Sequence, residues 1–199
     1  MPFKIGLYGS ASIPSQATLN KAEQTGSALG KQNCTVITGA CSGLPYRGAR
    51  EAAASGGMVI GYSPVRSMEE QRSFTPQDDL SIYAHIYFTP TLPIFDDLDV
   101  AKKYRNVIST AQCDGGIILA GGWGTLHEFC SLVDFGKVIG VVTGTDGIAD
   151  LLEEITETVP AGTEIIFDAD PATLVKKVLD HLENHQTSSP DSLSPSHQH

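Results

Sequence analysis

Short apolar runs alternate along the chain with stretches of helical residue spacing. The apolar runs lack the polar alternation of half-exposed strands, and such runs are typical of parallel strands that are buried on both faces. The runs that predict strands are 3–8, 35–38, 58–62, 85–89, 115–120, 138–142 and 164–167. The stretches that predict helices are 18–29, 46–55, 96–111, 125–134, 147–158 and 171–184. The order predicts an α/β fold: a doubly wound, Rossmann-like parallel sheet of about seven strands with helices on both faces.

Two segments depart from this alternation. The segment 63–80 is polar and of mixed charge, so it reads as a lid, a partner surface or a solvated loop. The end of the chain, 186–199, is rich in Ser, Pro and His without apolar periodicity, which predicts a disordered tail. A length of 199 residues suits one domain. We therefore expect a single nucleotide-binding domain over 1–185.

Charge and cysteine usage restrict the possible partners. The chain has 13 Lys and Arg against 23 Asp and Glu, a net charge of −10, which disfavours binding to a nucleic-acid backbone. It has no apolar stretch long enough for a spanning helix and no basic run for a lipid surface. The four cysteines form no C-x-x-C pair, as in a reducing compartment. We expect a cytoplasmic protein with no metal site and with neither a membrane nor a nucleic acid as partner.

Three glycine-bearing turns follow predicted strands, at 8–12, 38–44 and 120–125. Carboxyl ends of parallel strands meet at one edge of the sheet, and helix N-termini there favour anions, above all phosphate. None of the turns matches G-x-G-x-x-G or G-x-x-x-x-G-K-[ST], so the common dinucleotide and ATPase motifs are absent. The candidate phosphate- or nucleotide-binding residues are Gly9, Ser10, Gly39, Gly43, Gly121, Gly122, Gly124 and Thr125.

Two charged residues near the third turn are candidates for chemistry. Glu128 follows Thr125 with T-x-x-E spacing, which fits a capping box; alternatively its carboxylate faces the crevice and orients water or balances a developing cation. Arg105 sits between aliphatic positions of the preceding helix, and its fork geometry suits a phosphate or a carboxylate. Trp123 lies in the turn itself, where it either covers a ligand or wedges the loop.

The third turn and the preceding arginine resemble the signature of the Lonely Guy (LOG) group, within the Rossmann-like superfamily labelled "possible lysine decarboxylase". The hallmark of that group is P-G-G-x-G-T-x-x-E after an arginine-bearing helix. The segment from Gly121 to Glu128 is similar to it, and Glu128 follows Arg105 by 23 residues. Further similar segments are 9–10, 38–44, 56–61 and 137–142, so the resemblance spans residues 4–154.

The resemblance implies a hydrolase that cleaves the N-glycosidic bond of a nucleoside 5′-monophosphate and releases base and ribose 5-phosphate. In that reading Gly121, Gly122, Gly124 and Thr125 hold the 5′-phosphate, while Arg105 and Glu128 carry the catalysis. No cofactor is implied, and the family commonly forms homodimers. Lysine decarboxylation is excluded because the lysine arrangement for a pyridoxal phosphate Schiff base is missing.

Several positions depart from the LOG pattern. Ala120 replaces the leading proline, Pro45 stands where methionine is usual, and Asn106 follows Arg105 in place of lysine. Asn106, the short connection after Glu128 and the segment 63–80 are closer to a sister branch that includes molybdenum-cofactor carrier-like proteins. The alternative function is therefore a nucleotide or pterin-phosphate binding protein without turnover. A third is a nucleotide sensor that acts through an oligomer interface.

Overall fold

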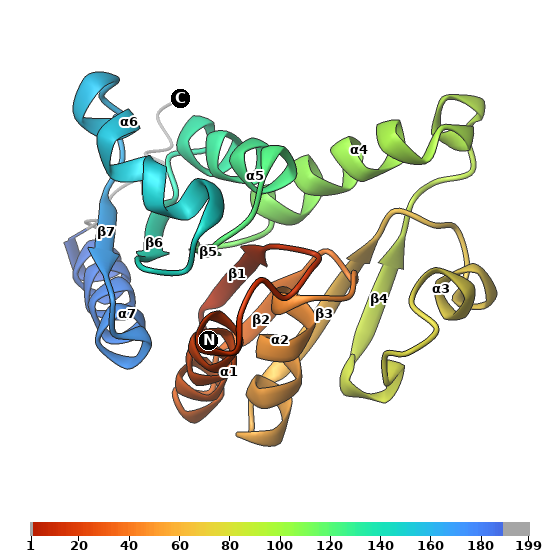
Figure 1. The fold of residues 1–199 in the computed structure, drawn as a ribbon, viewed down its shortest axis with the longest axis horizontal. Helices are drawn as coiled ribbons and strands as arrows, with labels where there is room; N and C mark the ends of the chain where they lie inside the picture. Colours follow the sequence, from red (N-terminus) through yellow and green to blue (C-terminus); the bar gives the residue numbers. More distant parts are fainter. Residues whose placement is uncertain (1, 189–199) are drawn as a thin grey trace, which may run out of the picture.

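The computed structural model describes residues 2–188 and contains one seven-stranded parallel sheet (Figure 1). The strand order is β4-β3-β2-β1-β5-β6-β7, so the chain builds outward from β1 in one direction and then in the other. The strands are β1 (Lys4–Gly9), β2 (Thr35–Thr38), β3 (Met58–Ser63), β4 (His85–Phe88), β5 (Gly115–Leu119), β6 (Val138–Val142) and β7 (Ile165–Asp168). The direction of winding reverses between β1 and β5, where open α/β sheets place their ligand crevice.

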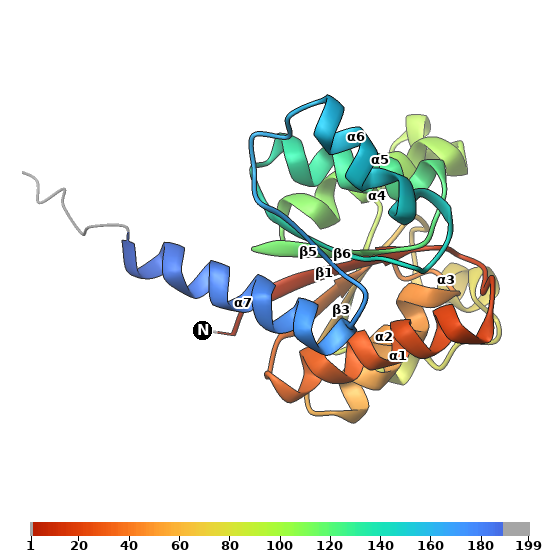
Figure 2. The same cartoon turned by 60° about the vertical axis from the view of Figure 1, so that its left-hand side comes forward.

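Helices cover both faces of the sheet, which confirms the predicted fold class (Figure 2). One face carries α1, α2 and α7, and the other carries α4, α5 and α6 (Figure 2). The helices are α1 (Gln16–Lys31), α2 (Leu44–Ala54), α3 (Met68–Phe74), α4 (Leu98–Ala111), α5 (Trp123–Asp134), α6 (Leu152–Thr158) and α7 (Pro171–Ser188). Short 3-10 turns are η1 (Leu80–Ile82), η2 (Pro93–Asp96) and η3 (Gly147–Leu151).

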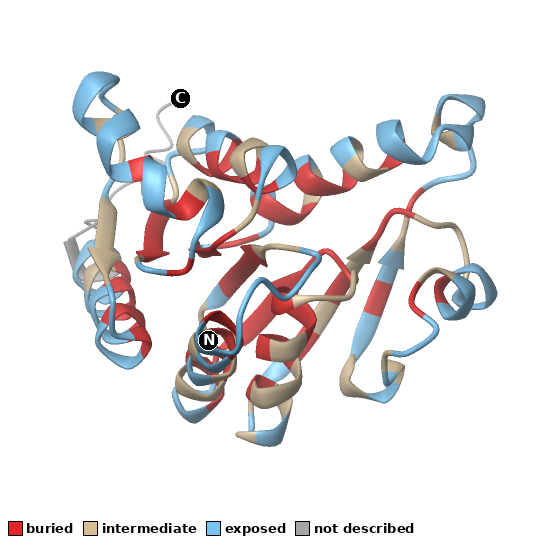
Figure 3. Cartoon of the chain, viewed as in Figure 1, coloured by how far each residue is buried: buried red, intermediate tan, exposed pale blue. Residues whose placement is uncertain are grey.

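The apolar runs are the buried centre of the molecule. All five residues of β5 and all five of β6 are buried, whereas the edge strands β4 and β7 are only partly covered (Figure 3). Glycines let the layers approach closely, because a Cβ on Gly116 would lie 2.5 Å from Leu132 of α5. Burial on both faces explains why these strands read as continuous apolar sequence.

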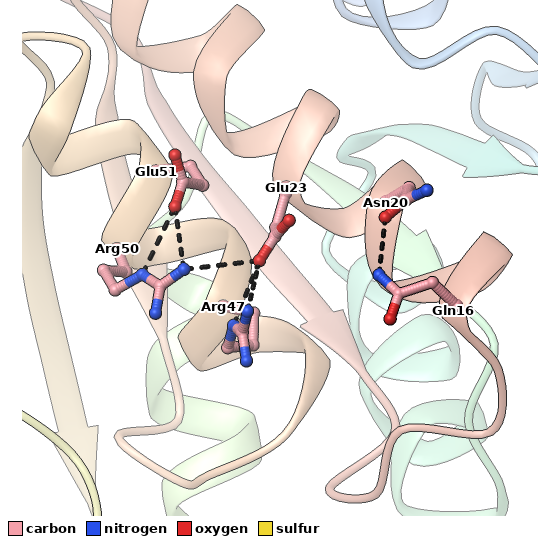
Figure 4. Close-up of polar contacts among 6 residues, drawn as sticks. All are labelled: Gln16, Asn20, Glu23, Arg47, Arg50 and Glu51. Carbon is pink, nitrogen blue, oxygen red and sulfur yellow. Dashed lines mark hydrogen bonds and ion pairs between the residues drawn. The ribbon is translucent and has the colours of Figure 1, made fainter.

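An ion-pair network ties α1 to α2 beside a tight helix contact (Figure 4). Glu23 of α1 accepts from Arg47 at 2.6 Å and from Arg50 at 3.3 Å. A Cβ on Gly26 would lie 1.8 Å from the carbonyl oxygen of Gly48, so the two backbones nearly touch. Together these contacts fix the helix that follows the β2 turn.

Several element boundaries differ from the sequence-based prediction. Both α2 and α5 begin two residues earlier than expected, at Leu44 and Trp123, because glycines rather than side-chain oxygens precede them. The predicted helix 147–158 is a 3-10 turn followed by α6, and the segment 63–80 contains α3. Helix α7 continues to Ser188, three residues into the predicted tail, and 189–199 lie outside the described residues.

Candidate functional site

A cavity of about 450 Å³ opens at the carboxyl ends of β1 and β2. We call it the glycine cavity. Its walls come from the turns after β1, β2 and β5, from the end of α3, and from α4 and α5. Among the candidate residues, those that line it are Gly9, Ser10, Gly39, Gly122, Gly124, Thr125, Arg105 and Glu128.

Two candidate glycines do not line the glycine cavity, but they shape its walls. Gly43 has φ +94 as the N-cap of α2, and a Cβ there would lie 2.5 Å from the carbonyl oxygen of Ser10. Gly121 has φ +91, and a Cβ there would lie 2.2 Å from the hydroxyl of Thr125. Both positions therefore require glycine for the backbone geometry of the turn.

The turn after β5 is held in a left-handed conformation. Ala120 has φ +50, a value that proline cannot adopt, so the proline of the LOG hallmark would not fit this backbone. The amide of Ala120 donates to the hydroxyl of Thr145 at 2.9 Å, and its carbonyl accepts from Ala149 at 3.2 Å. These bonds to Thr145 and Ala149 hold the turn in place, so that the start of α5 lies at the cavity.

The first turn of α5 has open amides. Its N-cap is Gly122, no side chain caps it, and the first intrahelical bond runs from the amide of Leu126 to Gly122. A Cβ on Gly122 or on Gly124 would meet nothing within 4 Å, so packing within the described chain does not require glycine at either position. Open amides and unobstructed space together fit an approaching anion.

The capping-box interpretation of Thr125 and Glu128 is wrong. Because α5 begins at Trp123, Thr125 is the third helical residue and Glu128 the sixth, one turn too far along to cap the helix. The side chain of Glu128 is instead 93% buried and lines the glycine cavity. Burial raises the pKa of this carboxyl to about 7, and the opposing effects of Arg105 and then Lys103 only partly offset it.

Arg105 reaches the same cavity from α4. A Cβ on Gly39 would lie 1.2 Å from its Nη1, so the guanidinium rests on the β2 turn in space that only glycine leaves free. Its Nη2 donates to the sulfur of Cys41 at 3.5 Å, while its Nε is buried without a hydrogen-bond partner in the described chain. Within that part of the chain, no ion pair joins Arg105 to Glu128.

The remaining cavity wall on α4 is positive and polar. Lys102 and Lys103 both line it, and Lys102 is also paired with Asp99 at 3.0 Å. Asn106 follows Arg105 into the cavity, where its Nδ2 lies 3.4 Å from the carbonyl oxygen of Gly124. Its Oδ1 is the other buried side-chain atom without a partner in the described residues.

Sequence reasoning missed the contribution of the segment 63–80. Phe74 and Thr75, at the end of α3, line the glycine cavity. Gln71 of α3 is fully buried, donates to the carbonyl of Ala40 at 2.9 Å and accepts from Ser63 at 2.6 Å. The end of this segment is therefore a wall of the site, which none of the three readings included.

Tyr8 was also missed as a site residue, although it ends an identified strand. Tyr8 lines the cavity, and its hydroxyl lies 3.3 Å from the sulfur of Cys113. Burial raises the pKa of Tyr8 well above its ordinary value, so the phenol stays protonated. Trp123 was expected either to cover a ligand or to wedge the loop. It does neither, because it is 84% exposed and is not among the residues that line the cavity.

Within residues 2–188, no group of three or more His, Cys, Asp or Glu residues is arranged to hold a metal ion. In the same part of the chain, no helix is long and apolar enough to cross a membrane. All four cysteines are free.

Comparison with known proteins gives a family and a fold. A model described as the SLOG cluster4 family matches residues 2–175. The structure of TM1055 superposes with a TM-score of 0.71 at 17% identity, over 91% of this chain and 99% of that one. No protein with a curated description matches the sequence.

Two further solved structures are similar at equally low identity. The molybdenum cofactor carrier protein MCP from Chlamydomonas reinhardtii has a TM-score of 0.64 at 20% identity, over 90% of this chain and 99% of that one. DNA processing protein A from Helicobacter pylori, described by its single-stranded DNA binding mode, has a TM-score of 0.60 at 15% identity, over 95% and 82% of the two chains. At these identities the likeness shows a shared fold.

Proposed function

Because the chain belongs to the SLOG cluster4 family, within the superfamily that its motifs indicated, we propose that its glycine cavity binds a phosphate-bearing small molecule. The observation that carries the proposal is the open start of α5 beside two buried charged residues that are not paired with each other. A nucleoside 5′-monophosphate is the ligand class that we favour. The absence of nucleic-acid partners remains a prediction that rests on the charge of −10.

The phosphate of this ligand would lie at the first turn of α5. The amides of Trp123, Gly124 and Thr125 are not used by the helix, so three donors are free to meet the phosphate oxygens. The helix dipole adds a partial positive charge there, and Lys103 contributes a full charge from the facing helix. These groups supply local attraction for an anion in a chain that is negative overall.

We further propose that the cavity hydrolyses the N-glycosidic bond of that nucleotide. As the bond to the base breaks, positive charge develops on the ribose, and the ionised carboxylate of Glu128 stabilises it. Water adds at the same carbon and gives its proton to Glu128, which passes it to the base as the base leaves with the bonding electrons. A carboxyl with a pKa of about 7 is suited to accept and return that proton near neutral pH. Arg105 anchors the substrate.

The test is release of free base from adenosine 5′-monophosphate, with Glu128→Gln and Arg105→Ala as variants. The hydrolase proposal expects turnover by the wild type and its loss in both variants, with circular dichroism spectra unchanged. If folded Glu128→Gln kept full turnover, Glu128 would not take part in the reaction. Absence of turnover on every nucleotide tested, with tight retention of a ligand, would favour the carrier function.

The carrier function is the second candidate because of the similarity to the carrier protein MCP. In that case the same α5 amides would hold the phosphate of a pterin, and Glu128 would titrate without catalysing a reaction. Mass spectrometry of the protein purified under mild conditions would detect a retained pterin phosphate. Light scattering tests separately the prediction that the chain forms a homodimer or a higher homo-oligomer. Dissociation of that oligomer when nucleotide is added would support the sensor function instead.

A further inference from the structure

A second cavity, of about 190 Å³, lies beside the glycine cavity at the carboxyl ends of β3 and β4. We call it the tyrosine pocket, because its walls include Tyr62, Tyr87 and Tyr104. Phe88 and Pro90 add further apolar surface. The pocket is open to solvent on the side of Tyr87, whose surface is half exposed.

Arg105 lines both the tyrosine pocket and the glycine cavity. Its guanidinium rests on Gly39, just past the end of β2. In the sheet order β4-β3-β2-β1-β5, the strands that end at the tyrosine pocket, β3 and β4, adjoin β2, the nearest of the strands that end at the glycine cavity. Arg105 is therefore the side chain at the boundary of two adjoining spaces, and its buried Nε–H has no partner within residues 2–188.

The tyrosine pocket is built in advance from paired rings. Tyr62 and Tyr87 are stacked, with centroids 5.0 Å apart and planes at 23°. Tyr104 packs against Phe95 of η2 with centroids 4.6 Å apart. Such contacts hold the rings in one orientation, so a planar ligand would not have to order them.

The small polar groups of the tyrosine pocket are already used by the protein. The hydroxyl of Ser63 donates to Gln71 at 2.6 Å, and that of Thr89 donates to the carbonyl of Ser63 at 2.9 Å. What remains for a ligand is aromatic surface with the tyrosine hydroxyls, and the unpaired N–H of Arg105. That combination recognises a flat ring with a hydrogen-bond acceptor at its edge.

We propose that the tyrosine pocket binds the planar nitrogen heterocycle of the same ligand whose phosphate lies at α5, with a ring acceptor on the Nε–H of Arg105. This inference rests on the proposed phosphate site. Strands are about 4.8 Å apart, so the three intervals from β5 to β3 span about 14 Å, a distance in the range of an extended mononucleotide. The bond between sugar and base would then lie close to Arg105, between the two cavities.

The experiment measures binding by isothermal titration calorimetry with two probes. Formycin 5′-monophosphate is a purine-like nucleotide whose carbon–carbon glycosidic bond resists hydrolysis, and ribose 5-phosphate is the same ligand without the ring. Wild-type protein should bind the formycin nucleotide about ten-fold or more tightly than ribose 5-phosphate, because stacking of one base contributes about 1–3 kcal/mol.

Two variants from different elements, Tyr62→Leu and Tyr104→Leu, should each reduce that preference about five-fold or more. Their affinity for ribose 5-phosphate should not change, which shows that the phosphate site and the fold are intact. Phe74→Leu is the matched control, because it removes an aromatic ring from the glycine cavity. Loss of preference in Phe74→Leu, with both tyrosine variants unaffected, would place the ring in the glycine cavity and overturn the inference.

The probes also separate this inference from the proposed function. Equal affinity of the wild type for both probes would refute the ring site while leaving the phosphate site in place. If neither probe binds, the phosphate site itself is refuted, and the tyrosine pocket loses its ligand with it.

Discussion

Replacing Glu128 with glutamine should stabilise the protein at alkaline pH while abolishing the proposed turnover. The carboxyl of Glu128 is buried, and its pKa is raised from 4.5 to about 7. Between these two values the folded state holds a proton that the unfolded chain has lost. Stability is therefore greatest below pH 4.5 with respect to this group, and it falls as the pH rises through 7. Glutamine has nearly the same shape and no such dependence.

The size of the effect follows from the interval between the two pKa values. Each pH unit of that interval is worth about 1.4 kcal/mol, so ionising Glu128 costs the fold about 3 kcal/mol by pH 8. For a chain of this length, about 3 kcal/mol corresponds to about 6–12 °C in melting temperature. The gain of Glu128→Gln over wild type should grow by that amount between pH 4.5 and pH 8.

The assay is urea denaturation of both proteins at several pH values from 4.5 to 8. Comparison with wild type cancels the titration of all other groups, which the two proteins share. Glu157→Gln serves as the control, because Glu157 is exposed and does not line the glycine cavity. If the difference between Glu128→Gln and wild type did not change with pH, the carboxyl of Glu128 would not be desolvated, and its proton-transfer role would be refuted.

Three further changes test the site. Gly39→Ala should weaken nucleotide binding about ten-fold or more, because the new Cβ would lie 1.2 Å from the Nη1 of Arg105 and displace the guanidinium. Calorimetry measures the affinity, and an unchanged affinity would show that the guanidinium does not need to lie against residue 39 for binding. Gly124→Ala should leave the melting temperature near that of wild type, since nothing lies within 4 Å of the new Cβ, yet weaken binding; full affinity would show that no ligand approaches the start of α5. Alkylation of Cys41 by iodoacetamide should block ligand binding, because Cys41 lines the cavity. The variant Cys41→Ser should therefore keep its binding after treatment, whereas Cys130→Ser should lose it. Mass spectrometry identifies the modified thiol, and equal loss of binding in both variants would show that Cys41 is not the thiol responsible.

The strands were predictable because burial on both faces leaves a strong trace in the sequence. The runs in β5 and β6 contain only apolar residues and glycine, and all of them are buried. Helix starts were less predictable. Gly43 and Gly122 begin their helices without a side-chain oxygen, so the usual start signal is absent at both.

A helix signal was present where no helix was predicted. Ser67 and Glu70 have the S-x-x-E spacing of a capping box, and Ser67 accepts from the amide of Glu70 at 3.2 Å. The carboxylate of Glu70 in turn accepts from the amide of Arg66 at 2.9 Å. The same spacing at Thr125 and Glu128 misled, because a short motif has meaning only in register with the true start of the helix.

The candidate site was predictable in part. Strand order brings the three glycine turns to one edge, so residues far apart in sequence, such as Gly39 and Arg105, meet in space. The contributions of Phe74 and Tyr62 depend instead on how α3 and α4 pack over β3 and β4. No local pattern encodes such packing, and an aromatic residue at a strand end looks the same whether it faces a core or a pocket.

Unpaired polar groups are the strongest physical argument for a ligand. Among the described residues, the buried side-chain atoms without a hydrogen bond are Arg105 Nε and Asn106 Oδ1, which are neighbours on α4 and line one cavity. Glu128 lines the same cavity, where the charges of Arg105 and Lys103 act on its carboxyl. A buried polar group left unsatisfied costs about 1–3 kcal/mol, and folded proteins retain such groups mainly where function requires them. A ligand with a ring acceptor would satisfy the Nε–H of Arg105, and a ligand hydroxyl could donate to the Oδ1 of Asn106.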